Sequence, residues 1–256
     1  METTQLQYWL ALNEVPNIGG SRALKLLQNI TLQTLFQDPT QAQQYCKLNH
    51  QQLQAINQPD WQAINQHIAW LEGHDNRHII TIADPDYPLA LKNVPSPPMI
   101  LYVEGDVSLL NSPQIAMVGT RNPSYYGKRY AHSLAAELAD SGLTITSGLA
   151  IGIDSECHKS VLDAGGKTIA VLGTGLANIY PKRHKKLAAQ IIENGALVSE
   201  FKKSEGISPR DRRWTWLFGE RKLVTAAKRM FRDTASHVPC IFKSRPPKIF
   251  SRSSQK

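Results

Sequence analysis

The sequence predicts an α/β protein: a Rossmann-like parallel sheet with crossover helices, preceded by a small all-α domain. Two observations support this. From residue 113 onward, short apolar runs alternate with amphipathic helical patterns, whereas residues 4–70 show helical spacing alone. Strands separated by helices require a parallel sheet with right-handed crossovers.

The N-terminal region, residues 1–71, is predicted to be a helical domain of the SAM or helix-hairpin-helix type. Its amphipathic turns carry Leu6, Trp9 and Leu10. The stretch Val15–Leu27 contains Gly19-Gly20 followed by Ser21. Glycine amides at such a hairpin can meet a DNA phosphate. The simpler interpretation is a connection in which the glycines end one helix and Ser21 caps the next.

Residues 72–110 are rich in turn residues and are predicted to be an extended connector leading into the sheet domain, with one short strand at 100–103. Residues 111–201 are predicted to form the sheet domain. In its first helix, Tyr130, Leu134 and Leu138 form one apolar stripe. The predicted strands are 115–118, 143–146, 168–172 and 196–199, and the predicted helices are 126–141, 154–164 and 182–193.

The net charge of +8 is unevenly distributed along the chain. Residues 1–110 carry five Lys/Arg against ten Asp/Glu, and residues 111–201 carry nine against seven. The remaining 55 residues carry fifteen against four. The basic character therefore belongs to the tail, and the isoelectric point alone does not indicate that the folded part binds DNA.

Other sequence signals point to a cytoplasmic protein. No apolar run approaches the ~20 residues of a membrane span, and the N-terminus lacks signal-peptide features. Cys46, Cys157 and Cys240 are far apart and contain no CxxC pair, which indicates neither a disulfide framework nor a zinc site.

Glycine, hydroxyl and cationic residues follow the predicted strands. Because the carboxyl ends of parallel strands share one edge, these loops are expected to form an anion-binding site there. The candidate phosphate-binding residues are Gly119, Thr120, Arg121, Ser147, Gly148, Gly152, Lys182 and His184.

Fingerprints of small phosphate ligands are absent: there is neither a GxGxxG after the first strand nor a GxxxxGK[ST]. Ser147, Asp154 and His158 could be imagined as a catalytic triad, but the serine is not in a GxSxG motif. Asp154 is better interpreted as a helix N-cap, with His158 as its structural partner one turn later. No catalytic residue, cofactor or metal is predicted, and ligation by the Cys157–His158 pair is not favoured.

An ordered set of motifs resembles the DprA/Smf family (DNA-processing protein A) over roughly residues 5–201. The motifs are Tyr87-Pro-x-x-Leu91 with Pro97-Pro98, Val118-Gly-Thr-Arg121 with Tyr126-Gly127, Ser147-Gly-Leu-Ala-x-Gly-Ile-Asp154 with His158, Ala170-Val-Leu-Gly-x-Gly-Leu176, Tyr180-Pro181 with His184, and Leu197-Val-Ser-Glu-Phe201.

The resemblance implies a single-stranded DNA-binding protein of natural transformation that protects incoming DNA and helps load RecA recombinase. It also implies a homodimer without a known catalytic step or metal, and no membrane partner is expected. By this resemblance Arg121 and Lys182 contact DNA phosphates, while Gly119-Thr120 and Ser147-Gly148 line the same pocket. One alternative is a phosphoribohydrolase-like enzyme acting on a nucleoside phosphate, although its Pro-Gly-Gly-x-Gly-Thr-x-x-Glu motif is absent. The other is an inactive remnant.

Residues 202–256 depart from the family pattern, because the strand–helix rhythm stops and no asparagine follows Phe201. We interpret this tail as an out-of-frame or degenerate translation. The alternative is a divergent basic arm in which Trp214 and Trp216 stack on bases. Loss of the family's last strands is expected to leave the strand 196–199 at an exposed edge and to impair dimerisation and RecA contact.

Overall fold

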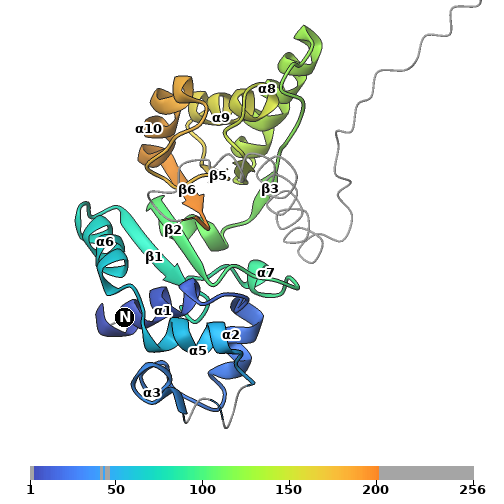
Figure 1. Cartoon of the computed structure of the whole chain (residues 1–256). Coiled ribbons are helices and arrows are strands. Elements are labelled where there is room, and N and C mark those ends of the chain that lie inside the picture. Colours follow the sequence, from blue (N-terminus) through green and yellow to red (C-terminus); the bar gives the residue numbers. More distant parts are fainter. Residues whose placement is uncertain (1–2, 41–42, 44–46, 202–256) are drawn as a thin grey trace, which may run out of the picture.

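The computed structural model of the chain describes residues 3–40, 43 and 47–201 (Figure 1). Both interpretations of residues 202–256 lie outside the described residues, as do Cys46 and Cys240. Every helix in the described part is too short or too polar to span a lipid bilayer.

The N-terminal domain is built from short helices around one apolar core. Polar caps fix where these helices begin: Thr31 and Asp60 accept hydrogen bonds from backbone amides three residues later, and Asn49 forms a capping box with Gln52. Trp9 and Leu10, predicted to face the core, are each only 2% exposed. The described helices are α1 (Thr3–Glu14), α2 (Gly20–Leu26), α3 (Leu32–Gln37), α5 (His50–Asn57) and α6 (Trp61–Glu72).

The glycine pair of the predicted hairpin serves packing between the helical domain and the rest of the chain. The Gly20 amide donates to the Pro97 carbonyl at 3.3 Å, and a Cβ at Gly20 would lie 2.7 Å from that oxygen. The Ser21 hydroxyl donates to the Pro95 carbonyl. The Gly20 amide therefore has a protein acceptor. The interpretation in which the glycines end one helix and Ser21 caps the next is wrong in detail, because α1 ends at Glu14, Gly19 is the N-cap of α2 and Ser21 lies inside α2.

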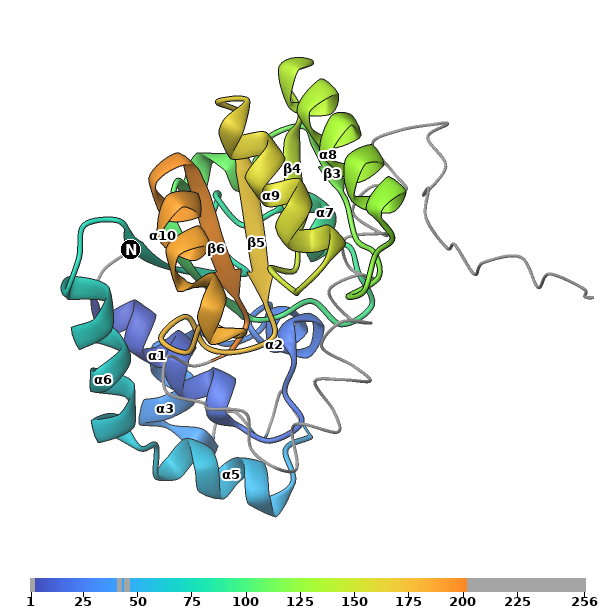
Figure 2. The same cartoon turned by 90° about the horizontal axis from the view of Figure 1, so that it is seen from above.

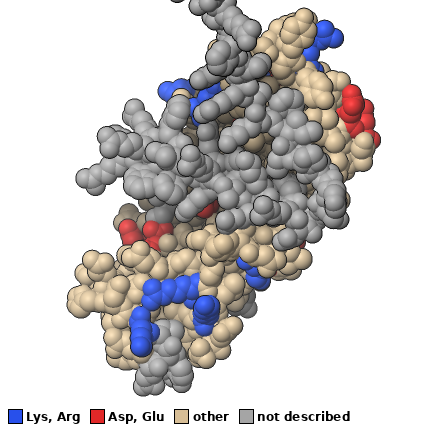
Figure 3. Space-filling model, turned by 90° about the vertical axis from the view of Figure 1, so that its right-hand side faces the viewer, with Lys and Arg blue, Asp and Glu red and all other residues tan. Residues whose placement is uncertain are grey.

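Lys and Arg side chains also gather on the helical domain (Figure 3). The Arg22 guanidinium of α2 donates to the carbonyls of Asn17 and Lys47 and to the Gln52 side chain. These bonds tie the hairpin to the segment before α5, so Arg22 has a structural role.

One six-stranded mixed sheet forms the second part of the structure, in the order β1-β2-β6-β5-β4-β3. The neighbours from β3 to β6 are parallel, and β1–β2 and β2–β6 are antiparallel. Together with the helical N-terminal domain, this sheet and its crossover helices confirm the predicted fold class. The strands are β1 (Arg77–Thr81), β2 (Ile100–Gly105), β3 (Gln114–Ala116), β4 (Thr144–Ser147), β5 (Thr168–Leu172) and β6 (Gly195–Ser199).

The segment predicted as a connector, residues 72–110, is instead part of the sheet. It supplies β1 and β2, and also the short helices α7 (Leu89–Lys92) and η1 (Val107–Asn111). Strand β2 pairs with β6, with Val103 opposite Val198, and every residue of β6 is buried. The prediction that residues 196–199 form an exposed edge is therefore wrong. The neighbour comes from earlier in the chain, and at the edges of the described sheet lie β1 and β3.

Three crossover helices cover one face of the parallel strands (Figure 2). In α8 the buried residues are Ala131, Ala135 and Ala139, whereas Tyr130 is 58% exposed. Leu138 packs against this core but is only half-buried, so the inward-facing stripe of α8 is the alanine stripe and not the predicted Tyr130–Leu134–Leu138. Small alanine side chains allow α8 and its neighbour to approach closely. The helices are α8 (Tyr125–Asp140), α9 (Ile153–Asp163) and α10 (Lys185–Asn194), with the 3-10 turn η2 (Lys182–His184) preceding α10.

Candidate nucleic-acid interface

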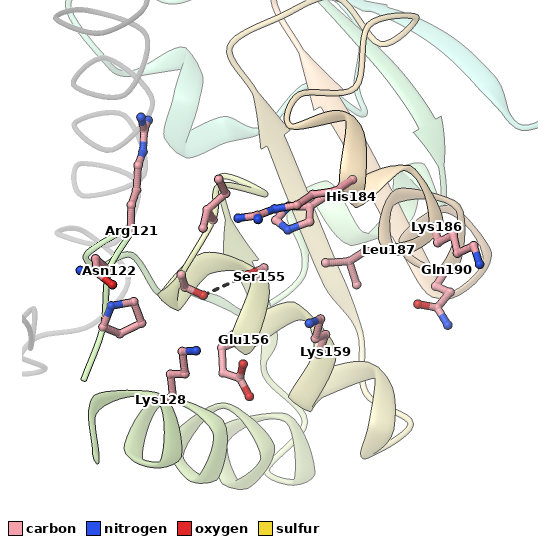
Figure 4. A pocket seen from close by; sticks show the side chains of 14 residues that line it. Arg121, Asn122, Lys128, Ser155, Glu156, Lys159, His184, Lys186, Leu187 and Gln190 are labelled. Carbon is pink, nitrogen blue, oxygen red and sulfur yellow. Dashed lines mark hydrogen bonds between the residues drawn. The ribbon is translucent and has the colours of Figure 1, made fainter. Parts of the chain in front are cut away.

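A cavity of about 550 Å³ lies at the carboxyl edge of the parallel strands, where the crossover helices begin (Figure 4). Its walls come from the loops after β3 and β4, from η2, and from α8, α9 and α10. The lining residues are Arg121, Asn122, Pro123, Lys128, Ile151, Gly152, Ser155, Glu156, Lys159, Arg183, His184, Lys186, Leu187 and Gln190.

Positive charge dominates this cavity. Five of its lining side chains are Lys or Arg and one is an acid, Glu156. Glu156 contacts the His132 ring at 3.2 Å. Residues 111–201 contain nine Lys/Arg against seven Asp/Glu, so more than half of their cations surround one cavity. Such a concentration in a nearly neutral domain favours an anionic ligand.

The structure brings three predicted site residues to the cavity wall and adds four cations that the sequence reasoning missed. The predicted three are Arg121, Gly152 and His184. The missed cations lie in the first two turns of α8, α9 and α10 or in η2, segments that lie at the carboxyl edge of the sheet. The four missed cations are Lys128, Lys159, Arg183 and Lys186. The signal that could have found them is the presence of Lys and Arg early in the helices that follow the strands.

Lys182 does not line the cavity, although it was predicted to contact phosphate. It opens η2 and is exposed, while the next residue, Arg183, takes the place on the wall. Thr120 is exposed, and its hydroxyl oxygen accepts from the Asn122 amide at 3.2 Å. It therefore holds the turn that presents Arg121.

Asp154 links the two glycine loops predicted to bind phosphate. One carboxylate oxygen accepts from the Gly119 amide at 3.4 Å, and the other accepts from the Gly148 amide at 3.2 Å. An internal carboxylate therefore occupies the donors that were assigned to a ligand phosphate. The N-cap of α9 is Gly152, so the prediction that Asp154 caps this helix is wrong. Its structural role is to fasten two strand-to-helix loops together.

Close approach explains the glycines at this edge. Gly152 has φ +96°, and a Cβ there would lie 2.3 Å from the Thr120 carbonyl oxygen. The Ile153 amide donates to that same carbonyl at 3.2 Å. The loops after β3 and β4 therefore touch backbone to backbone, and only glycine leaves room for the contact.

Ser147 and His158 each have another partner, so the imagined triad is not assembled. The Ser147 hydroxyl, 3% exposed, donates to the Met117 carbonyl at 2.6 Å and ties β4 to the chain after β3. His158 Nδ1 lies 2.7 Å from the Thr168 hydroxyl. Ser147 therefore lies behind the cavity and cannot donate the same proton to a phosphate.

Two buried groups next to the cavity, the His158 ring and the Cys157 thiol, are uncharged at neutral pH. Burial, assisted by the nearby charge of His184, lowers the pKa of His158 to about 3. Burial, with Asp154 and Glu156 nearby, raises the pKa of the Cys157 thiol to about 12. Among the residues that the structure describes, no group of three or more His, Cys, Asp or Glu side chains could hold a metal ion.

His184 fixes the loop that follows β4. Because the Leu149 carbonyl can only accept, His184 Nδ1 is the protonated nitrogen of their 2.9 Å hydrogen bond. Leu149 has φ +55°, a strained backbone conformation for leucine. The histidine thus stabilises this loop while its ring also lines the cavity.

Fold and site together define a class: an α/β protein with a cation-lined cavity at the carboxyl edge of a parallel sheet. Comparison with known families is more specific. The chain matches the family described as DNA recombination-mediator protein A over residues 78–226 and the SMF/DprA SAM domain over residues 1–69. The chain belongs to the DprA/Smf family. Its match runs past residue 201, where the recognised motifs end.

Individual relatives agree with this assignment. Protein Smf of Escherichia coli K12 is 39% identical over 196 residues, covering 76% of this chain and 52% of the relative. Protein Smf of Synechocystis is 35% identical over 212 residues, covering 78% and 52%. The chain thus spans about half the length of these curated relatives.

Two solved structures are similar. The X-ray structure of DNA processing protein A from Streptococcus pneumoniae has a TM-score of 0.69 and 26% identity, covering 86% of this chain and 75% of that one. The DNA processing protein A of Helicobacter pylori has a TM-score of 0.51 and 31% identity, covering 60% and 66%. The latter structure is described by its single-stranded DNA binding mode.

Proposed function

We propose that this chain binds single-stranded DNA, with the phosphates contacting the cations of the carboxyl-edge cavity. The observation that carries the proposal is the concentration of five Lys and Arg side chains around one cavity. A run of phosphates matches several separated cations better than one small anion does. The single-stranded DNA binding of the Helicobacter pylori relative supports the same ligand.

Contacts of this kind carry little sequence information. The Gly119 and Gly148 amides are bonded to Asp154, which leaves side-chain cations as the main phosphate ligands. Lysine and arginine contacts to phosphate position a strand without reading its bases. We therefore expect binding that is strongly salt-dependent and nearly independent of sequence.

The proposed role is one of binding, and the imagined Ser147–Asp154–His158 triad gives no support for catalysis, because Ser147 and His158 are hydrogen-bonded to other residues. The family resemblance extends the proposal to natural transformation: protection of incoming DNA, loading of RecA, action as a homodimer and a cytoplasmic location. The RecA and dimer parts are proposals about the whole family protein, of which this chain spans about half.

The test is a salt titration of binding to a fluorescent oligo-dT. If each of the five cations neutralises one phosphate, log affinity should fall with log salt at a slope of about −3.5, and duplex of the same length should bind more weakly. Arg183→Ala, Lys159→Ala and Arg121→Ala should each weaken binding across all sequences and flatten the slope by about 0.7.

Lys167→Ala provides the matched control, because Lys167 is exposed and precedes β5, at the opposite edge of the sheet. Lys182→Ala tests the assignment made from sequence, and should have less effect than Arg183→Ala. A folded sample that binds no oligonucleotide would refute the function. Equal losses for Lys167→Ala and for the cavity variants would refute the site.

A further inference from the structure

The cation-lined cavity contains an acid that phosphate binding alone does not explain. Among the described residues that line it, Glu156 is the single acid beside five Lys and Arg side chains. It lies in the first turn of α9, and Lys128 of α8 lines the same wall (Figure 4). Like charges repel, so an ionised Glu156 opposes the approach of a phosphate to this wall.

The Glu156 carboxylate is paired with a histidine of the neighbouring helix. His132 Nδ1 of α8 lies 3.2 Å from Glu156 Oε1 of α9. Lys128 and His132 are four residues apart, so both lie on the side of α8 that faces the cavity. The Ser160 hydroxyl of α9 donates to the His132 carbonyl and joins the two helices at the same place. The packing of α8 on α9 therefore holds the His132 ring beside Glu156.

The His132 ring can take up a second proton and keep this contact. An ionised carboxylate only accepts hydrogen bonds, so Nδ1 carries the proton of the neutral ring, and Nε2 is the nitrogen that is protonated in mild acid. The side chains of His132 and Glu156 are 46% and 27% exposed, so water reaches the pair. The pair carries a charge of −1 with a neutral ring and no net charge with an imidazolium.

The charged groups around this pair give the proton its effect. Lysine and arginine ordinarily stay charged between pH 6 and 8, whereas histidine does not. The five cations and Glu156 sum to +4, and a proton on His132 raises the total to +5. His184 of η2 also lines the cavity, with its Nδ1 bonded to the Leu149 carbonyl. The cations that face the cavity are Arg121, Lys128, Lys159, Arg183 and Lys186.

We propose that the Glu156–His132 pair makes strand binding proton-dependent: a proton on His132 offsets the Glu156 charge and tightens the binding of single-stranded DNA to the cavity. This inference rests on the proposed function and adds a regulation of the same site. Partly exposed charge pairs of this kind change an affinity by about 2- to 5-fold. Because linkage is reciprocal, a bound strand in turn favours the protonated ring, so binding takes up protons.

The experiment measures the affinity for fluorescent oligo-dT at pH 8, 7 and 6 and at constant ionic strength. The native chain should bind about 2- to 5-fold more tightly at pH 6 than at pH 8. His132→Gln should remove most of this pH dependence. Glu156→Gln should bind at pH 8 about as tightly as the native chain does at pH 6, because both cavities then carry +5. A purely structural ion pair would give neither the gain in affinity nor the pH dependence.

Two matched controls lie at exposed positions outside the cavity lining. His74→Gln removes a histidine, and Glu193→Gln removes an acid near the end of α10. Neither variant should change the affinity at pH 8 or its pH dependence. Thermal unfolding midpoints at pH 7 should show that all variants are folded. Calorimetry of the native chain at pH 6.5, in buffers of different ionisation enthalpy, should show proton uptake on binding and needs no variant.

The outcomes separate this inference from the proposed function. A native chain that binds no oligo-dT at any of the three pH values would remove the proposed function itself. Equal affinities at pH 8 and pH 6 without proton uptake, or an unchanged affinity of Glu156→Gln at pH 8, would overturn the role of the pair and leave phosphate binding intact. A pH dependence that survives in His132→Gln would also overturn it and would assign the proton to His184.

Discussion

The buried histidine of α9 should make the stability of this protein sensitive to mild acid. Thr168 Oγ1 donates to the Ile145 carbonyl, so it accepts from His158 Nδ1–H, and Nε2 is left unprotonated. Nε2 is buried and has no hydrogen-bond partner among the described residues. A second proton there would place an unpaired charge in the core, next to His184.

The sign and size of this pH effect on the free energy of unfolding follow from the lowered pKa of His158, which is about 3 in the folded protein against the ordinary 6.5. Below pH 6.5 the His158 ring binds a proton in the unfolded chain but not in the folded protein, so the free energy of unfolding decreases as the pH falls. The contribution of the neutral His158 ring to the free energy of unfolding is fully present above pH 6.5 and is lost progressively as the pH falls toward 3. Between pH 7 and pH 5 this single group should remove about 2 kcal/mol, a substantial share of a typical 5–15 kcal/mol.

The assay is urea unfolding followed by far-UV circular dichroism at pH 7, 6 and 5, where most carboxylates remain ionised. His158→Gln should reduce the pH dependence by about one proton, while His74→Gln, at an exposed position, should not. NMR titration of the native protein offers a second readout, in which the His158 ring resonances should not shift between pH 8 and pH 5. A pH dependence unchanged by His158→Gln, or a His158 ring that titrates near pH 6, would refute the reasoning.

Two further predictions concern the loops at the cavity. Gly152→Ala should reduce the free energy of unfolding by about 2–4 kcal/mol and weaken oligonucleotide binding, since its Cβ would displace the Thr120 carbonyl. The control is Gly142→Ala, which is also at positive φ but has nothing within 4 Å of its Cβ. Urea unfolding should show that this variant loses only about 1 kcal/mol of the free energy of unfolding. Equal losses in the two variants would contradict the clash at Gly152. Asp154→Asn should lower the free energy of unfolding by about 1–3 kcal/mol, because it weakens the charge-assisted hydrogen bonds to the Gly119 and Gly148 amides. The control is Asp163→Asn, at the exposed end of the same helix. Matching effects of the two variants in urea unfolding would mean that Asp154 does not fasten the loops.

The hydrogen bonds of Asp154 change which groups of the proposed anion site are available to a ligand. Sequence reasoning assigned the backbone amides of two glycine loops to a phosphate, as in many strand-to-helix turns. Here an internal carboxylate accepts from both amides and holds the loops rigid. In the proposed function, the phosphates then contact side-chain cations at the cavity wall. A site of this kind accommodates a flexible strand, because lysine and arginine side chains can follow its phosphates.

Local patterns were enough to predict the strand and helix alternation. A strand such as β5 is visible because five successive residues, Thr168–Leu172, are mostly apolar and a helix pattern follows. The prediction of which face of α8 is buried was wrong because it also relied on local hydrophobicity, and tyrosine and leucine are more hydrophobic than alanine. Only packing against α9 shows that the small Ala135, fully buried, faces inward while Tyr130 does not.

The sequence by itself determined the helical start followed by a sheet, the parallel rhythm of residues 111–201 and the edge of the sheet at which the cation-lined cavity lies. Tertiary structure alone decided that β2 returns to cover β6, that Asp154 takes the glycine amides, and that Lys128, Lys159 and Lys186 meet at one cavity. The physical reason is the separation in sequence between the residues that interact. Strand and helix formation depends on residues a few positions apart, whereas β2 and β6, Gly119 and Asp154, and the three lysines lie tens of positions apart in the chain and become neighbours only when the crossovers close the sheet.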